Sequence, residues 1–105
     1  MKTGKTAKKE ILITLMEEAS GTSTSSEGLT LFYAMDKVLK AHHKVKLSLS
    51  KCTPLSTSFL NASFGEICDK YGFAFVRKNI VLTNYVYSQA MQIKKHLEEL
   101  QKLVR

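Results

Sequence analysis

The chain has 105 residues, a length that suits one domain with a single hydrophobic core. Hydrophobic residues make up 44% of it and charged residues 24%, which are ordinary globular values and exclude a chain that is disordered along its length. No apolar run is long enough to span a bilayer or to form the core of a secretion signal, so we expect a cytoplasmic protein without a membrane segment. Cys52 and Cys68 lack metal-ligand spacing, so we expect two free thiols, no metal site and no cofactor.

The net charge of +7 is concentrated in two places. Residues 1–9 form a predicted flexible basic tail. The segment 37–51 contains no acid and carries Lys37, Lys40, Lys44, Lys46 and Lys51. These lysines predict either a plain solvated face or contacts with nucleic-acid phosphates, and a nucleic-acid-binding accessory protein is therefore the alternative function. Arginine, the preferred reader of base edges, is not clustered, which argues against sequence-specific DNA recognition.

The first predicted element is a short buried strand over residues 10–16, which are apolar and partly β-branched. A loop rich in Ser, Thr and Gly follows over residues 17–28. Thr24 stands three residues before Glu27, which is the spacing of a capping box at the start of a helix. The apolar face of this helix is predicted to consist of Leu29, Phe32, Met35, Val38 and Leu39.

Residues 44–50 alternate between apolar and polar side chains, which predicts a strand that buries Val45, Leu47 and Leu49. Pro54 ends this strand in a turn. A second helix is predicted over residues 57–71, because hydroxyl side chains precede a segment of helical periodicity and Gly72 terminates it.

Residues 73–83 are predicted to contain one or two short strands, and Asn84 is a candidate cap for the last helix. An apolar stripe from Val86 to Val104 follows, which either packs on the sheet or pairs two copies of the chain, so both monomer and homodimer remain open. Alternation of strands and helices predicts a single α/β domain over residues 10–105, with a small mixed or parallel sheet of about four strands and three helices.

Within residues 46–72 a strand leads into a Ser/Thr-rich turn and a helix that begins at Ser-Phe. The residues that carry this pattern are Leu47, Leu49, Leu55, Ser56, Thr57, Ser58, Phe59 and Gly65. The pattern resembles the signature of the STAS-like family of bacteria and their mobile elements. Residues 80–84 likewise look like the last strand of that family, which ends in Asn ahead of the final helix. The resemblance implies a STAS-like α/β fold.

The STAS-like family is in turn similar to anti-sigma-factor antagonists, which carry an Asp-Ser-Ser-Gly turn whose second serine is phosphorylated by a partner kinase. Ser56 stands in the Asp position, Thr57 and Ser58 in the two Ser positions, and Phe59 in the Gly position. The resemblance therefore implies that these four residues bind a regulatory protein such as an ATPase-type kinase. It also makes Ser58 the candidate phosphorylation site.

The residues themselves suggest a related but more modest role for this turn. A hydroxyl at a helix start accepts a hydrogen bond from a free backbone N–H, so one of the three hydroxyls is predicted to be the N-cap. A phosphate there would carry negative charge at the positive end of the helix dipole. The sequence presents no pair of carboxylates and no Ser-His-Asp arrangement for catalysis, and we expect a non-enzymatic interaction module.

Overall fold

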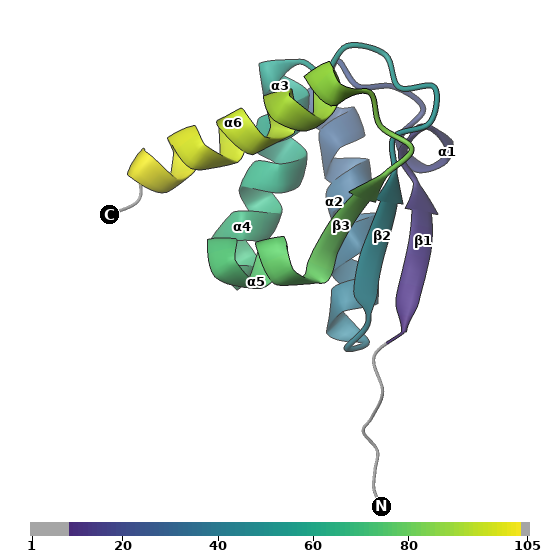
Figure 1. The fold of residues 1–105 in the computed structure, drawn as a ribbon, viewed down its shortest axis with the longest axis vertical. Coiled ribbons are helices and arrows are strands. Elements are labelled where there is room, and N and C mark those ends of the chain that lie inside the picture. Colours follow the sequence, from purple (N-terminus) through teal and green to yellow (C-terminus); the bar gives the residue numbers. More distant parts are fainter. Residues whose placement is uncertain (1–8, 104–105) are drawn as a thin grey trace, which may run out of the picture.

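The protein was analysed as a computed structural model, which describes residues 9–103. Three strands, β1 (Glu10–Thr14), β2 (Lys44–Ser48) and β3 (Ile80–Thr83), form a parallel sheet in the order β1-β2-β3 (Figure 1). Parallel neighbours require a crossover connection, and each crossover here is helical. Residues 9–103 thus contain three strands rather than the predicted four, and all three are parallel.

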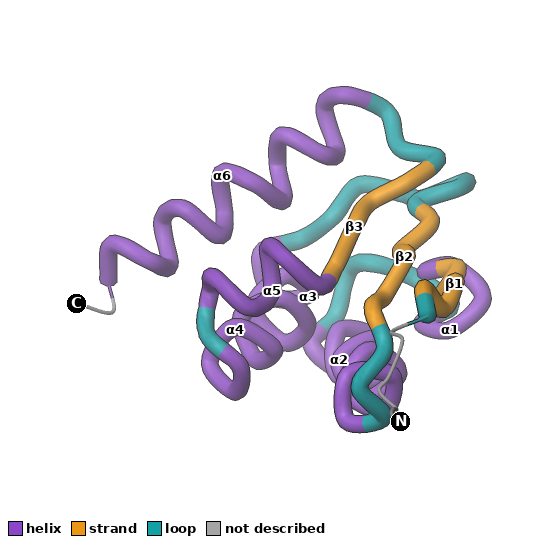
Figure 2. The backbone as a smooth tube through the Cα atoms, turned by 60° about the horizontal axis from the view of Figure 1, so that its bottom comes forward, coloured by secondary structure: helices purple, strands orange, loops and turns teal. Residues whose placement is uncertain are grey.

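Helical segments account for most of the remaining chain (Figure 2). They are α1 (Leu15–Ala19), α2 (Ser25–Lys40), α3 (Thr57–Leu60), the π-helical segment η2 (Asn61–Gly65), α4 (Glu66–Tyr71), α5 (Phe73–Asn79) and α6 (Tyr87–Leu103). Because α3, η2 and α4 follow one another without a break, they form the single helix predicted over residues 57–71. The described chain therefore has two short helices, α1 and α5, beyond the three that were predicted.

The first strand is shorter than the prediction of residues 10–16. It ends at Thr14, and α1 begins at Leu15. Leu15 and Ala19 lie four residues apart and are both buried, so one helical turn covers this part of the core better than an extended strand would. The predicted loop at 17–28 is correspondingly reduced to residues 20–24, and it begins at Ser20, whose backbone is left-handed with φ of 64°.

The capping box predicted at Thr24 and Glu27 is confirmed, and it starts α2. The buried face of α2 is nevertheless rotated from the predicted one. Leu31, Met35 and Leu39 are buried, while Leu29 is 38% exposed. Met35 and Leu39 are buried as predicted, whereas the prediction missed Leu31 and wrongly included Leu29.

Residues 73–83 contain one strand, β3, preceded by the helix α5. Of the two predicted possibilities, one strand is confirmed and two strands are wrong. Gly72 has φ of 89°, a conformation that glycine adopts readily, and it separates α4 from α5. Across this break the rings of Tyr71 and Phe75 stack with their centroids 5.1 Å apart. Val76 is buried on the inner side of α5.

The last helix begins at Tyr87, three residues after the predicted cap Asn84. Asn84 has a left-handed backbone with φ of 52°, and its side-chain amide donates a hydrogen bond to the Ser48 hydroxyl at 3.0 Å. Within the predicted apolar stripe Ile93 is buried, but Val86 is 58% exposed because it precedes the helix. Val104 lies outside the described residues, as do residues 1–8 of the predicted basic tail.

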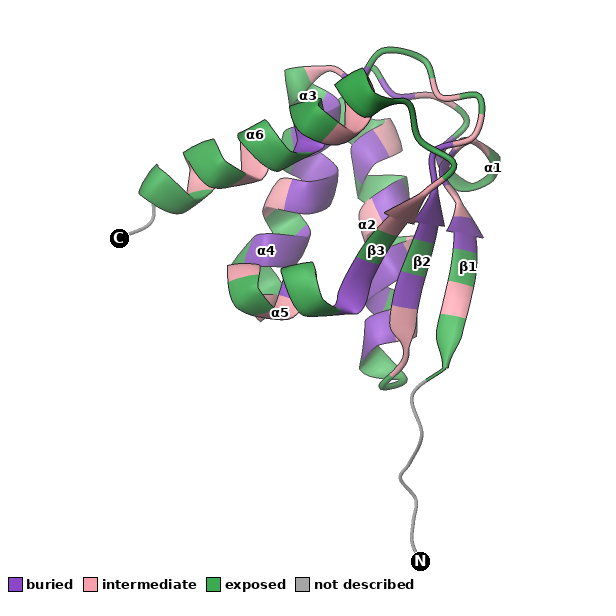
Figure 3. Ribbon diagram, in the orientation of Figure 1, coloured by how far each residue is buried: buried purple, intermediate pink, exposed green. Residues whose placement is uncertain are grey.

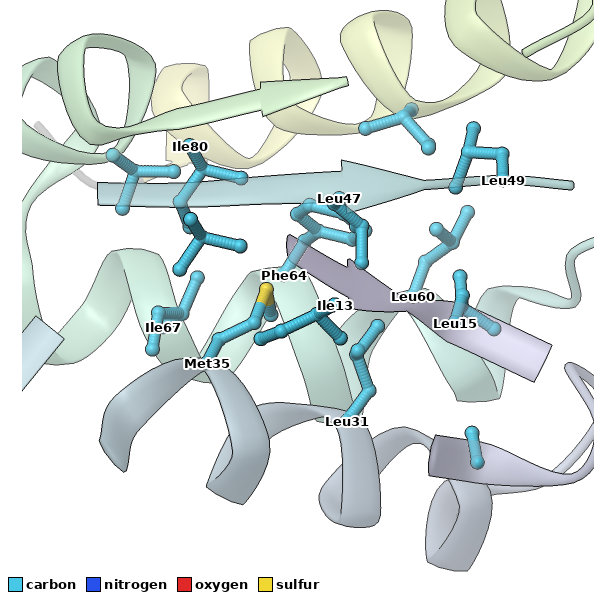
Figure 4. Packing of buried hydrophobic residues seen from close by; sticks show 14 of the residues in the cluster. Ile13, Leu15, Leu31, Met35, Leu47, Leu49, Leu60, Phe64, Ile67 and Ile80 are labelled. Carbon is cyan, nitrogen blue, oxygen red and sulfur yellow. The ribbon is translucent and has the colours of Figure 1, made fainter. Parts of the chain in front are cut away.

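The core lies between one face of the sheet and helices α2 and α3–α4 (Figure 4). Val45, Leu47 and Leu49 of the central segment are all buried, which confirms their predicted alternation. The opposite face of the sheet carries no helix within residues 9–103 and shows exposed positions on all three strands (Figure 3). None of the helices in this range is both long and apolar enough to cross a bilayer.

Candidate interaction site

The three connections that leave the carboxyl ends of the strands meet at one edge of the sheet (Figure 1). This is a consequence of parallel topology, because every strand ends at the same side. In open α/β sheets this edge is the usual place for binding sites. The Ser/Thr-rich turn of residues 56–58 belongs to it, at the start of α3.

Thr22, from the connection between α1 and α2, fixes the chain that leads into this turn. Its side chain is buried, and its hydroxyl lies 2.8 Å from the Pro54 carbonyl and 2.5 Å from the Thr53 hydroxyl. The backbone N–H of Ser56 donates to the Thr22 carbonyl at 2.9 Å. A buried polar residue that is fully hydrogen-bonded specifies one arrangement of the surrounding loop.

Helix α6 holds the same loop from its other side. The side-chain amide of Gln89 donates to the Cys52 carbonyl at 3.0 Å, and that of Gln92 donates to the Leu55 carbonyl at 2.6 Å. Residues 52–56 are therefore hydrogen-bonded both to the connection between α1 and α2 and to helix α6, which are distant in sequence.

Ser56 is the N-cap of α3, which identifies the capping hydroxyl among the three candidates. Its oxygen accepts a hydrogen bond from the Phe59 N–H at 3.0 Å and donates one to the Ser23 carbonyl at 2.9 Å. The Phe59 side chain is completely buried in the core. Ser56 and Phe59 therefore hold the turn in place, and Phe59 offers no surface to a partner in this conformation.

Thr57 and Ser58 are the exposed members of the turn. They occupy the first two positions of α3, and neither hydroxyl has a hydrogen-bond partner within residues 9–103. Ser58 borders a shallow groove of about 330 Å³ between α2 and the start of α3. The groove is lined by Ser25, Leu29, Ser58, Asn61, Ala62 and Glu66.

The groove is shallow because α2 and α3 approach each other to backbone contact at Gly28. A Cβ atom placed there would lie 2.5 Å from the Phe59 carbonyl oxygen and 2.8 Å from the Ala62 Cβ. Only glycine fits this approach. The π-helical segment, which begins at Asn61, faces the same contact, and π-segments within α-helices often accompany functional sites.

The charge beside the groove is negative before any modification. Glu66 lines it, and Glu27 caps α2 close by. Hydrogen bonds from the Ser23 backbone and from Thr24 hold the pKa of Glu27 below its ordinary value, although desolvation opposes them, so this carboxylate is charged at neutral pH.

A second cluster, which the sequence did not reveal, joins α2 to α4. The buried carboxylate of Asp36 accepts hydrogen bonds from the Tyr71 hydroxyl at 2.7 Å and from the Lys70 ammonium at 2.9 Å, and Lys40 lies 3.3 Å away. Burial alone would raise the pKa of Asp36, but these hydrogen bonds outweigh it and lower the pKa. Burial and the neighbouring carboxylate raise the pKa of Tyr71 to about 12, so its hydroxyl stays a donor and the cluster fixes the helices.

The two cysteines are free, as predicted. Burial raises the pKa of Cys68 to about 11 and also raises that of Cys52, so both thiols are protonated at neutral pH. Residues 9–103 contain no group of three potential metal-ligating side chains.

The five lysines of the alternative function do not share one face. Lys46 lies on the open face of the sheet, whereas Lys37 lines a groove between β1 and α2. Lys40 pairs with Asp36. Lys44 begins β2, and Lys51 follows its other end, beyond a strand about 13 Å long.

Residues 27–87, more than half of the chain, match the family described as a STAS-like domain of unknown function (DUF4325). The match contains β2, the turn of residues 56–58, β3 and the beginning of α6, and it confirms the resemblance found in the sequence. No curated protein and no solved structure matches the chain.

Proposed function

The chain belongs to the STAS-like family of domains of unknown function, and on that premise we propose that it is a non-enzymatic module whose Ser58 groove binds a regulatory protein. The observation that carries the proposal is that two residues of the turn have structural roles and the other two are exposed. The Ser56 hydroxyl caps α3 and the Phe59 ring is buried in the core, while Thr57 and Ser58 are exposed at the start of α3. The loop before them is hydrogen-bonded to Thr22 and to Gln92.

The shape of the groove favours a protein partner over a small molecule. It is shallow and open, and its apolar part is formed by Leu29 and Ala62. Small-molecule sites are usually deeper and enclose most of their ligand. An apolar side chain of a partner would fit between the two helices, and a basic residue beside it would meet Glu66.

Two departures from the Asp-Ser-Ser-Gly pattern occur at buried or structural positions. Ser replaces Asp at the cap, and both residue types are strong N-caps. Phe replaces Gly at position 59, where the ring fills the core. Hydroxyl residues are retained at positions 57 and 58, which supports the proposal that this surface binds a regulatory protein as the corresponding turn of anti-sigma-factor antagonists does.

Phosphorylation of Ser58 by a partner of the ATPase-type kinase class is the regulation that we propose for this site. A phosphate at the second helical position carries roughly −1.5 to −2 charges and is favoured by the helix dipole, so the fold would tolerate it. It would also sit beside a groove that already contains Glu66. A partner that inserts an apolar group there would lose affinity because a charged group would have to be desolvated.

The lysine positions support nucleic-acid binding less well, because phosphate contacts need a basic face and these side chains are spread over several. Binding through them would weaken steeply as salt concentration rises. Protein binding in an apolar groove would be far less sensitive to salt.

Quantitative affinity capture from the native host tests the proposal with two matched variants. Ser58→Glu adds a negative charge at the second position of α3, and Ser88→Glu adds one at the second position of α6. We expect Ser58→Glu to lose a protein that wild type and Ser88→Glu retain at both low and high salt. Equal recovery with all three chains would refute the proposal, and intact-mass measurement of the captured chain would reveal a phosphate at Ser58.

A further inference from the structure

Strand β1 is an edge strand of the sheet, and helix α1 follows directly at its carboxyl end (Figure 1). The Lys44 N–H donates to the Lys9 carbonyl at 2.8 Å, so Lys9, Ile11 and Ile13 direct their main-chain groups toward β2. Because successive residues of a strand alternate in direction, those of Glu10, Leu12 and Thr14 point to the outer edge. Within residues 9–103 no strand pairs there.

This edge lacks two of the usual features that prevent strand addition. It has neither proline nor lysine between residues 10 and 14, and its centre is the apolar run of residues 11–13. Leu12 is 59% exposed on the open face of the sheet. Natural proteins usually cover or pair an edge of this kind.

The helix-facing side of the same edge opens into a groove of about 410 Å³ between β1 and α2. Its lining is mostly apolar and includes Ile11, Ile13, Ala34, Val38 and Ala41. A strand added to β1 would place alternate side chains in this groove. The groove would therefore best accommodate a strand with apolar residues at every second position.

We infer that β1 pairs in antiparallel orientation with β1 of a second copy of the chain, which joins two three-stranded sheets into one of six strands. The pairing centres on Leu12, which lies opposite its own symmetry mate on the two-fold axis. Ile11 then lies opposite Ile13 on the helix-facing side, and Glu10 lies opposite Thr14. Every apolar residue of the strand meets an apolar residue, and no like charges meet.

The strand specifies this register. A shift by two residues in one direction places Leu12 opposite Glu10, and a shift in the other direction places it opposite Thr14. All three registers keep the outward-pointing main-chain groups paired, and the centred one alone places Leu12 opposite Leu12. A two-fold interface requires such self-complementarity, and the strand of residues 10–14 provides it.

Substitution at the two-fold axis tests the inference. Leu12→Lys and Leu12→Glu each place like charges directly opposite each other, so each variant is expected to remain at the 11.8 kDa mass of a single chain. An equimolar mixture of the two variants is expected to regain the doubled mass of wild type, because opposite charges then meet. Val81→Lys, on the same sheet face but on the other edge strand, should behave as wild type.

Light scattering from micromolar to millimolar concentration gives the mass, and circular dichroism confirms that each variant is folded. A wild-type mass that stays at one chain up to millimolar concentration would overturn the inference. Loss of the dimer in Val81→Lys, or a mixture of the Leu12 variants that stays monomeric, would also overturn it. Because the net charge of +7 on each chain opposes association of two wild-type chains, added salt should strengthen the dimer.

Discussion

Replacement of Gly28 by alanine tests the close approach of α2 and α3 that forms the Ser58 groove. The new Cβ would lie 2.5 Å from the Phe59 carbonyl oxygen, a backbone atom that cannot rotate away. Overpacking of this kind destabilises a protein by about 1–3 kcal/mol, and we take the upper value because the backbone itself must move. Alanine regains about 1 kcal/mol through its higher helix propensity, which leaves a net destabilisation of about 2 kcal/mol.

Gly65→Ala is the matched control, because it makes the same chemical change in the adjoining helical segment. Gly65 has helical dihedral angles, and its added Cβ would lie 3.6 Å from Leu100 Cδ1, an ordinary contact. Alanine should therefore stabilise the protein there by about 0.5–1 kcal/mol.

Urea unfolding followed by far-ultraviolet circular dichroism measures both free energies, and thermal unfolding gives a parallel readout. A net loss of about 2 kcal/mol lowers the melting temperature of a domain of this size by roughly 8–16 °C. The two variants should move in opposite directions. If Gly28→Ala were as stable as wild type, the backbone contact between α2 and α3 would not exist as described.

Three further predictions concern the turn, the Asp36 cluster and His96, a half-buried residue of α6. Ser56→Ala should lower the free energy of unfolding by about 2 kcal/mol, because it removes a helix cap and a second hydrogen bond. Ser58→Ala should change the free energy of unfolding by less than about 0.5 kcal/mol. Equal effects of the two variants in urea unfolding would contradict the roles assigned to these residues. Asp36→Ala should lower the free energy of unfolding by about 2 kcal/mol at neutral pH and should lower the pKa of Tyr71, which ultraviolet titration measures. Because the folded pKa of Asp36 lies below its ordinary 3.8, the stabilisation is complete above pH 3.8 and disappears as the pH falls through the folded value. An unchanged Tyr71 titration would rule out the contact. Burial lowers the pKa of His96 below 6.5, so its contribution to stability is complete above pH 6.5 and declines below it. His96→Leu should flatten that decline when urea unfolding is measured at several pH values. An identical pH profile for wild type and variant would refute this prediction.

The central part of the fold was predictable because its patterns are local. The alternation of residues 44–50 defines β2, and the spacing of Thr24 and Glu27 defines the start of α2. A Ser/Thr-rich turn before a periodic apolar segment likewise indicated the start of α3. Each of these signals lies within a few residues of the structure that it specifies.

The short helices α1 and α5 were missed because segments of five to seven residues contain too few turns to show a period. Residues 73–83 are apolar at most positions, so helix and strand patterns fit them equally well. The burial of Val76 against the core, which depends on the rest of the fold, decides in favour of a helix.

The polar contacts of the site were beyond sequence reasoning for a different reason. Thr22 bonds to a loop more than thirty residues away, and Asp36 bonds to Tyr71 at a similar separation. Neither residue has a local signature, since threonine and aspartate are common on surfaces. Their roles follow only from the tertiary arrangement of α2, and of the connection before it, against their neighbours.

Site-specific photo-crosslinking in the native host tests the central claim most directly, because it reports contact at a chosen residue. A photoreactive amino acid would replace Asn61, an exposed residue that lines the Ser58 groove, and in a matched chain Lys78, an exposed residue of α5 that does not line it. We predict a discrete protein adduct from position 61 that is absent from position 78 and is lost when Ser58→Glu is added. No adduct from position 61, or the same adduct from both positions, would contradict a regulatory partner bound at this groove.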